Sequence, residues 1–173
     1  GDVYKRQFLA CAKNGIIWSS CSPDFGAQGV VDRFKQIEPK VFITCDYYYY
    51  NGKKINILDK VEKILKQIPS IKKVIAFNYN KQERESLKNF VNFEETLKNN
   101  LDEVFERFEF NHPIYILFSS GTTGKPKCIT HGSGNVLIEH NKEFMLHCDI
   151  KENEKLFYYT TTGWMMWNWL VGG

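Results

Sequence analysis

The stretch PIYILFSSGTTGKPKCITH, residues 113–131, decides the fold class of this chain. The apolar run PIYILF (113–118) is typical of a buried strand, and KCITH (127–131) predicts a second strand. The loop at 119–127 carries two glycines, four hydroxyl side chains and two lysines. Glycines let backbone N–H groups approach an anion, and hydroxyl and ammonium groups add donors. We therefore predict a strand–loop–strand unit that binds phosphate, with a di- or triphosphate matching better than a monophosphate. A solvated hairpin loop is the alternative.

The loop differs from the Walker P-loop, whose pattern G-x-x-x-x-G-K-[ST] enters a helix. Gly121 and Gly124 are three positions apart, and Lys125 is followed by Pro126 instead of Ser or Thr. Pro126 also disfavours a helix that begins at Lys125. A Walker-type NTPase or kinase is therefore the weaker interpretation.

Strand and helix patterns alternate on both sides of this loop. We expect strands at 15–20, 40–46, 72–77, 113–118, 127–131 and 155–160. Helical patterns end at residue 13 and before Pro39, cover 57–69 and 135–149, and begin again within 163–173. Asn51-Gly52 predicts a turn, and the charged stretch 78–112 predicts one or two short helices, such as 94–105. This alternation predicts an α/β fold with largely parallel sheets flanked by helices, and no linker marks a domain boundary.

Composition excludes several classes of protein. The chain has 173 residues, is 43% hydrophobic and has a net charge of +3, so nothing in it demands nucleic acid or an anionic membrane. No apolar run reaches the roughly 20 residues that span a bilayer. The five cysteines form no CxxC pair and the four histidines lack metal-ligand spacing. We expect reduced thiols in a cytoplasmic protein, and no metal site built from these residues.

The loop and the strand before it resemble the signature of a known family. YILFSSGTTGKPK is similar to the phosphate-binding signature of the adenylate-forming (AMP-binding) enzymes, which include acyl-CoA synthetases. The stretches 15–53 and 127–173 both resemble the branch that activates acetoacetate, and the resemblance covers nearly all of 8–173, most weakly 78–112. It implies an incomplete N-terminal adenylation domain at 8–173, without the C-terminal domain, and small-molecule substrates: acetoacetate, ATP with Mg²⁺, and coenzyme A.

The resemblance also implies a reaction. A carboxylate attacks the α-phosphate of ATP and expels pyrophosphate, and the acyl-adenylate then reacts with the thiol of coenzyme A. The residues implied for the ATP phosphates are Ser119, Ser120, Gly121, Thr122, Thr123, Gly124, Lys125 and Lys127. The two glycines would permit close backbone approach, and Lys127 would orient the loop at its exit.

Choice of acid is implied by a second segment, Gly163-Trp164-Met165-Met166, which resembles the stretch that lines the acyl pocket of short-chain acyl-CoA synthetases. Acetyl-CoA synthetases read like T-A-D-x-G-W there, whereas this chain has Thr161 in place of the acidic residue. The departure agrees with the acetoacetate branch. Core packing is the alternative interpretation for Trp167 and Trp169.

Coenzyme A is implied at one further position. Lys53, with Lys54 beside it, aligns with a Gly-basic pair that meets the 3′-phosphate of coenzyme A in related synthetases, and Ser22-Pro23-Asp24 aligns with a wall of the same site. A solvated turn lysine is the alternative. The tyrosines at 47–50 fit either base stacking or alternation on a sheet.

The two ends give separate expectations. DVYKRQ (2–7) can be back-translated to GATGTGTATAAGAGACAG, a transposon end used to tag sequencing libraries, so residues 1–7 are expected to be adaptor-derived; a genuine helix segment is the alternative. WNWLVGG stops in apolar sequence. We expect an internal fragment that is inactive alone, with the ribose-binding Asp, the Glu near magnesium and the C-terminal lysine of the family beyond Gly173. The rival functions are an acetyl- or propionyl-type synthetase and a non-catalytic nucleotide-binding homologue.

Overall fold

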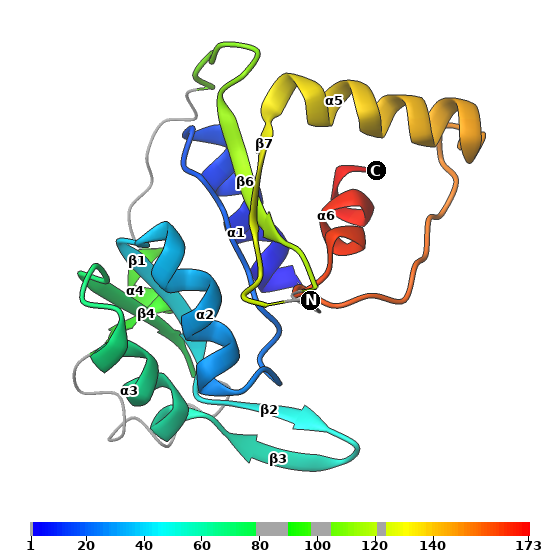
Figure 1. Ribbon diagram of the computed structural model, residues 1–173. Coiled ribbons are helices and arrows are strands. Elements are labelled where there is room, and N and C mark those ends of the chain that lie inside the picture. Colours follow the sequence, from blue (N-terminus) through cyan, green and yellow to red (C-terminus); the bar gives the residue numbers. More distant parts are fainter. Residues whose placement is uncertain (1, 79–89, 98–104, 121–123) are drawn as a thin grey trace. The chain divides into compact units, whose positions relative to one another are not determined.

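The computed structural model describes residues 2–78, 90–97, 105–120 and 124–173 (Figure 1). Contacts along the chain divide it into two compact units, 1–22 with 104–173 and 23–103. The chain therefore leaves the first unit, forms the second, and returns. Among the described helices, none is long and apolar enough to cross a membrane.

The unit 23–103 is built on a parallel sheet. Its strands are β1 (Val41–Cys45), β4 (Lys73–Phe77) and β5 (Val91–Asn92), in the order β1-β4-β5. Val41 lies opposite Lys73 and Cys45 opposite Phe77. Its helices are α2 (Ala27–Ile37), α3 (Leu58–Gln67) and α4 (Phe93–Thr96). Parallel strands accompanied by helices confirm the predicted α/β class.

Apolar residues at helical spacing explain α2 and α3. Val30, Val31 and Phe34 are buried on α2, and Phe34 packs edge-on against Phe42 of β1 at 6.1 Å. Val61, Ile64 and Ile68 on and after α3 are exposed by 2% or less. Burying each such side chain contributes about 1.5–3 kcal/mol relative to exposure, so this spacing determines which face of each helix turns inward.

A β-hairpin follows β1 in the same unit. Strands β2 (Tyr47–Tyr50) and β3 (Lys53–Asn56) pair antiparallel. Asn51 and Gly52 join them with φ angles of 47° and 72°, which confirms the predicted turn.

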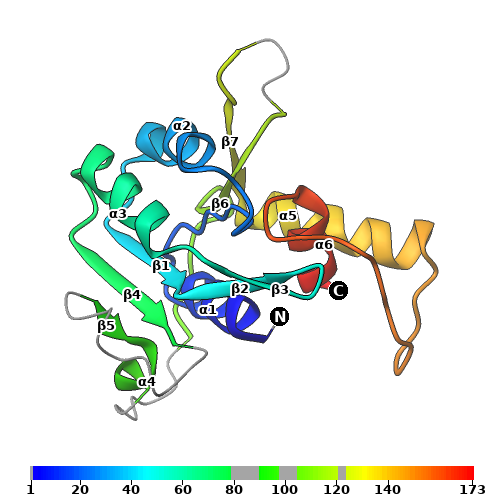
Figure 2. The same ribbon diagram turned by 90° about the horizontal axis from the view of Figure 1, so that it is seen from below.

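The unit 1–22 with 104–173 contains an antiparallel pair and most of the helices. Its elements are α1 (Asp2–Lys13), β6 (Pro113–Phe118), β7 (Cys128–Gly132), α5 (Ser133–Lys142), the π-helix η2 (Glu143–His147) and α6 (Met165–Gly172). An aromatic cluster forms its core: Phe8 of α1 lies 6.0–6.4 Å from the rings of Trp18, Tyr115 and Trp167. Figure 2 shows the described ends of the 119–127 loop projecting from β6 and β7, away from α1 and α6.

Two of the predicted strands are wrong. In 15–20 only Trp18 pairs, through an isolated parallel bridge to Tyr115. The stretch 155–160 has no regular structure, and Phe157 and Tyr159 are 85% and 87% exposed. Figure 1 shows it running along the outside of its unit, away from β6 and β7. β-branched and aromatic composition favours a strand, but a strand also needs a partner, and the described residues provide 155–160 with none.

Two predicted helices have different bounds. The helix expected at 135–149 begins at Ser133 and changes to π-helical geometry at Glu143, with the Cys148 N–H donating to the Glu143 carbonyl at 2.8 Å. The helix expected at 94–105 is the short α4, and residues 98–104 lie outside the described residues.

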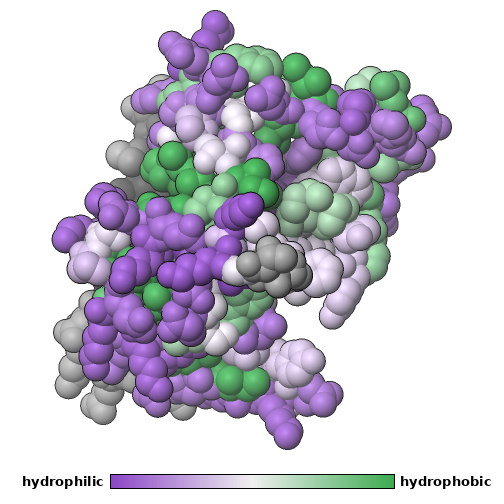
Figure 3. All heavy atoms as spheres, in the orientation of Figure 1, coloured by the Kyte–Doolittle hydropathy of each residue, from purple (hydrophilic) through white to green (hydrophobic). Residues whose placement is uncertain are grey.

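Figure 3 shows hydrophilic and hydrophobic residues side by side over α5. Leu137 and Ile138 are 64% and 61% exposed there, beside a chain of charged side chains described below.

Candidate functional site

The strand–loop–strand unit has the predicted form. β6 and β7 pair from Tyr115 opposite His131 to Phe118 opposite Cys128. The Ser119 N–H donates to the Lys127 carbonyl at 3.0 Å, and the Ser119 hydroxyl accepts from the Lys127 N–H at 2.9 Å. These two bonds close the base of the loop directly beyond the last strand pair. They fix the point from which the loop residues begin.

The described loop residues expose donors. Ser119 accepts one hydrogen bond and keeps its own O–H for another partner, because a hydroxyl both donates and accepts. Ser120, Lys125 and Lys127 are exposed. Gly124 has a φ of 147°, which favours glycine, and no atom of the described residues lies within 4 Å of the place where a Cβ would stand. A ligand can therefore approach the backbone closely at this position. The predicted phosphate residues Gly121, Thr122 and Thr123 lie outside the described residues.

The charge of the strand–loop–strand segment 113–132 favours binding of an anion. Residues 113–132 contain two lysines and no Asp or Glu. Beneath them, burial raises the pKa of Tyr115 to about 12, so its phenol stays neutral. The positive field of Lys125 and Lys127 is therefore not cancelled by an acidic side chain of the same segment.

The segment predicted to line the acyl pocket forms a turn and the first turn of α6. The Trp164 N–H donates to the Thr161 carbonyl at 3.0 Å and closes the turn. Trp164 and Met165 are 64% and 54% exposed, whereas Gly163 and Met166 are half-buried. The structure thus brings the four residues together as one surface at the N-terminal end of α6.

The two other tryptophans belong to the packing of this unit. Trp167 is buried against Phe8. Trp169 lies 4.7 Å from Phe144 and 6.1 Å from Tyr158, between ring centroids. Both tryptophans therefore fit the core interpretation, and the acyl-pocket role of 163–166 stays a prediction.

Residues 18–21 connect β6 to this turn. Trp18 exchanges backbone hydrogen bonds with β6, to Ile114 at 3.0 Å and from Ile116 at 2.9 Å. The Ser19 hydroxyl donates to the Ile116 carbonyl at 2.8 Å, and the Ser20 hydroxyl donates to the Thr162 carbonyl at 2.6 Å. Sequence reasoning missed both serines, because their partners are 97 and 142 positions away and leave no local pattern.

The unit 23–103 carries the predicted coenzyme A residue. Lys53 is exposed at the start of β3, opposite Tyr50. Lys54 is held over the ring of Tyr47, with Nζ 4.1 Å from the centroid. The coenzyme A role of Lys53 stays a prediction.

A further lysine supports the loop that begins this unit. Lys60 of α3 donates from Nζ to the carbonyls of Pro23 and, at 3.0 Å, of Phe25. Burial lowers the pKa of Lys60. No local pattern predicts this contact, which holds the backbone on both sides of Asp24.

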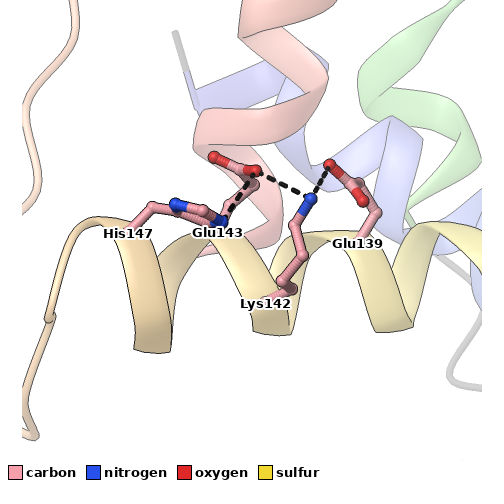
Figure 4. A network of polar contacts seen from close by, with 4 residues as sticks. All are labelled: Glu139, Lys142, Glu143 and His147. Carbon is pink, nitrogen blue, oxygen red and sulfur yellow. Dashed lines mark hydrogen bonds and ion pairs between the residues drawn. The ribbon is translucent and has the colours of Figure 1, made fainter.

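Charged side chains along α5 and η2 form a surface network (Figure 4). Lys142 Nζ lies 2.9 Å from Glu139 and 3.1 Å from Glu143, and His147 Nε2 lies 3.9 Å from Glu143. The hydrogen bond with Glu139 raises the pKa of Lys142. Exposed pairs of this kind contribute little to stability. Within the described ranges, no group of three or more His, Cys, Asp or Glu could hold a metal ion.

An open pocket of about 600 Å³ lies elsewhere on the same unit. Its lining includes Lys5, Phe144, Trp167 and Leu170, and residues 119–127 and 163–166 are not part of it. It is therefore separate from the candidate site.

Several known proteins that are similar to this chain belong to one family. The model of the AMP-binding enzyme family matches residues 7–171. Acetoacetyl-coenzyme A synthetase of Rhizobium meliloti (strain 1021) is 49% identical over 95% of this chain and 26% of its own length. Acetoacetyl-CoA synthetase of Gallus gallus is 46% identical, over 94% of this chain and 26% of its own. A solved acetoacetyl-CoA synthetase from Streptomyces lividans superposes with a TM-score of 0.90 at 41% identity, covering 97% of this chain and 26% of that one.

The superposition shows that this chain has the same fold as the matching region of that enzyme. The chain spans about a quarter of the length of the curated relatives it matches.

Proposed function

The chain belongs to the AMP-binding enzyme family, and from this premise we propose that its protein is an ATP-dependent acid–thiol ligase. It activates acetoacetate as the acyl-adenylate and transfers the acyl group to coenzyme A. The loop closed by Ser119 and Lys127 beyond β6 and β7 is the observation that carries the proposal. The names of the relatives at 49% and 46% identity support acetoacetate as the acid.

The phosphate loop fits ATP in its donor set. Ser119, Ser120, Thr122, Thr123 and Lys125 would hold the β- and γ-phosphates, with Gly121 and Gly124 allowing backbone N–H groups to approach and Lys127 anchoring the loop through its backbone. When bound, ATP supplies the electrophilic α-phosphorus and pyrophosphate as leaving group. Donors held in place before the reaction stabilise the charge that develops on the departing phosphates. Mg²⁺ is usually bound through such phosphates and only one or two carboxylates.

The surface at the start of α6 would receive the acid. Gly163 has no side chain to fill the space beside the turn, and Trp164, Met165 and Met166 would supply an apolar wall. Methionine side chains adapt to irregular shapes, which suits a short acid with a ketone.

Lys53 would bind the 3′-phosphate of coenzyme A. Its exposure on the hairpin supports this role, because an exposed ammonium group can pair with a phosphate without first losing a protein partner. The five cysteines form no disulfide, which fits a reducing compartment, so we place the protein in the cytoplasm.

The test is ATP–pyrophosphate exchange by the full-length gene product with acetoacetate, acetate, propionate, butyrate and 3-hydroxybutyrate. Strong exchange with acetoacetate alone is the expected result. Preference for acetate or propionate would show that the substrate is that acid and not acetoacetate, with the same mechanism. No exchange with any acid, from a folded protein that binds ATP, would identify a nucleotide-binding homologue without ligase activity.

A further inference from the structure

We propose that Ser20 is a positioning residue that sets where the acid-binding turn lies relative to the phosphate loop. The inference rests on the proposed function, because it gives the turn at 161–164 and the loop at 119–127 their roles. Its observation is separate: one short segment, 18–21, hydrogen-bonds both to β6, the strand that enters the loop, and to the turn.

The first half of the connection is anchored to β6. Trp18 is buried, bridges to Tyr115 and exchanges two backbone hydrogen bonds with β6. The Ser19 hydroxyl adds a bond to the Ile116 carbonyl. Since β6 runs directly into the phosphate loop, the position of 18–19 is determined by the strand that carries the loop.

The second half reaches the turn through Ser20. Its hydroxyl donates to the Thr162 carbonyl at 2.6 Å, and the Thr162 hydroxyl returns a longer bond of 3.5 Å to the Cys21 carbonyl. Thr162 is the second residue of the turn that Trp164 closes. Of these two bonds the one from Ser20 is short and well placed, whereas the one from Thr162 is at the limit of hydrogen bonding.

The consequence is geometric. Without the Ser20 hydroxyl, the Thr162 carbonyl loses its partner and the turn is free to shift, carrying Trp164 and the methionines after it. In-line attack requires the carboxylate oxygen within about 3–3.5 Å of phosphorus, and displacement of reacting groups by about 1 Å can lower a rate a hundredfold. Ser20 need not touch the acid to have this effect.

The experiment uses the full-length gene product and the variants Ser20→Ala, Ser20→Thr and Thr162→Val. We expect Ser20→Ala to raise KM for acetoacetate by about tenfold, to reduce the preference for acetoacetate over butyrate, and to leave KM for ATP unchanged. Ser20→Thr keeps the hydroxyl and should restore most of the preference. Thr162→Val removes only the longer bond and should have the smaller effect. Ser70→Ala is the matched control, because the Ser70 hydroxyl is buried without a hydrogen-bond partner among the described residues.

A second measurement is independent of turnover. Amide hydrogen exchange of peptides covering 160–166 should be about tenfold faster in Ser20→Ala than in the parent, with no change in peptides from α3. This reports how readily the turn opens, and Ser20→Cys, which replaces the hydroxyl with a weaker donor, takes the place of Ser20→Ala if that variant does not fold.

The outcomes are distinguishable. If the parent exchanges pyrophosphate with acetoacetate but Ser20→Ala keeps its acid preference and its amide protection, this inference is wrong and the proposed function stands. An equal fall in activity with every acid, without a change in KM for acetoacetate, would also overturn it, because that pattern indicates general destabilisation. If the parent shows no acid-dependent exchange, both proposals fall.

Discussion

Replacing Gly15 with alanine should lower the free energy of unfolding by about 2–4 kcal/mol. Gly15 ends α1 with a φ of 63°, a conformation that costs a residue with a Cβ about 1–2 kcal/mol. An added Cβ would also overlap the ring of Phe108 and lie 3.0 Å from His112 Nε2.

The neighbouring contacts supply the rest of the magnitude. Phe108 stacks on His112 with ring centroids 4.5 Å apart, and His112 Nε2 lies 2.9 Å from the Gly15 carbonyl oxygen. Losing the stack costs about 0.5–1.5 kcal/mol and losing the hydrogen bond a similar amount. Alanine also lowers the conformational entropy of the unfolded chain, which offsets about 0.4–1 kcal/mol of the lost stability.

Urea denaturation of the full-length gene product measures the change, and Gly29→Ala is the control. Gly29 lies inside α2, where an added Cβ makes only an ordinary contact of 3.8 Å with Arg33, so alanine should raise stability by about 0.5–1 kcal/mol. The two substitutions should therefore have opposite signs. If Gly15→Ala proves neutral or stabilising like Gly29→Ala, the argument from strain and overlap is refuted.

Further predictions concern the candidate site and one histidine. Thr123→Val should lower acid-dependent ATP–pyrophosphate exchange by about a hundredfold without changing the melting temperature, since a single preorganised donor contributes that much; an unchanged rate removes Thr123 from the site. Lys53→Ala should raise KM for coenzyme A by about tenfold and leave the exchange alone, whereas an unchanged KM means a solvated turn lysine. Met166→Gly should admit bulkier acids in the same exchange panel, and an unaltered acid profile would make Met166 a core residue. Burial holds the pKa of His140 below its usual 6.5, so the unfolded state takes up the proton first as pH falls. Stability should be level above about pH 6.5 and fall below it, and His140→Phe should flatten this fall in thermal melts; a parallel fall in the variant assigns it to other groups.

Local pattern predicted most of the elements because they depend on local chemistry. The stripe of Val61, Ile64 and Ile68 produces α3 at its expected place, and Asn51-Gly52 produces the hairpin turn. The strand–loop–strand form at 113–132 was predicted for the same reason, since PIYILF, the loop and KCITH are contiguous.

The wrong and missing parts depend on partners distant in sequence. LFYYT within 155–160 has the composition of a strand, but composition does not create a neighbour with which to pair. The position of 15–20 depends on contacts such as the Trp18–Tyr115 bridge, and the hydroxyls of Ser19 and Ser20 find their acceptors only when β6 and the turn lie beside them. Similarly, the extra residue in each π-helical turn of 143–147 leaves no mark in the apolar pattern.

The span of these hydrogen bonds also gives the candidate site an order of assembly. β6 and β7 are separated by a short loop, so their ladder can form as soon as both strands exist, whereas Ser20 meets Thr162 across 142 residues of chain. Closing long loops is the slow part of folding, and a nascent chain must also wait for its last residues to be synthesised. We therefore expect the base of the 119–127 loop to form first and the turn at 161–164 to be held in place last. Under the roles proposed above, a chain halted between these stages would have formed its phosphate-binding loop before its acid-binding turn.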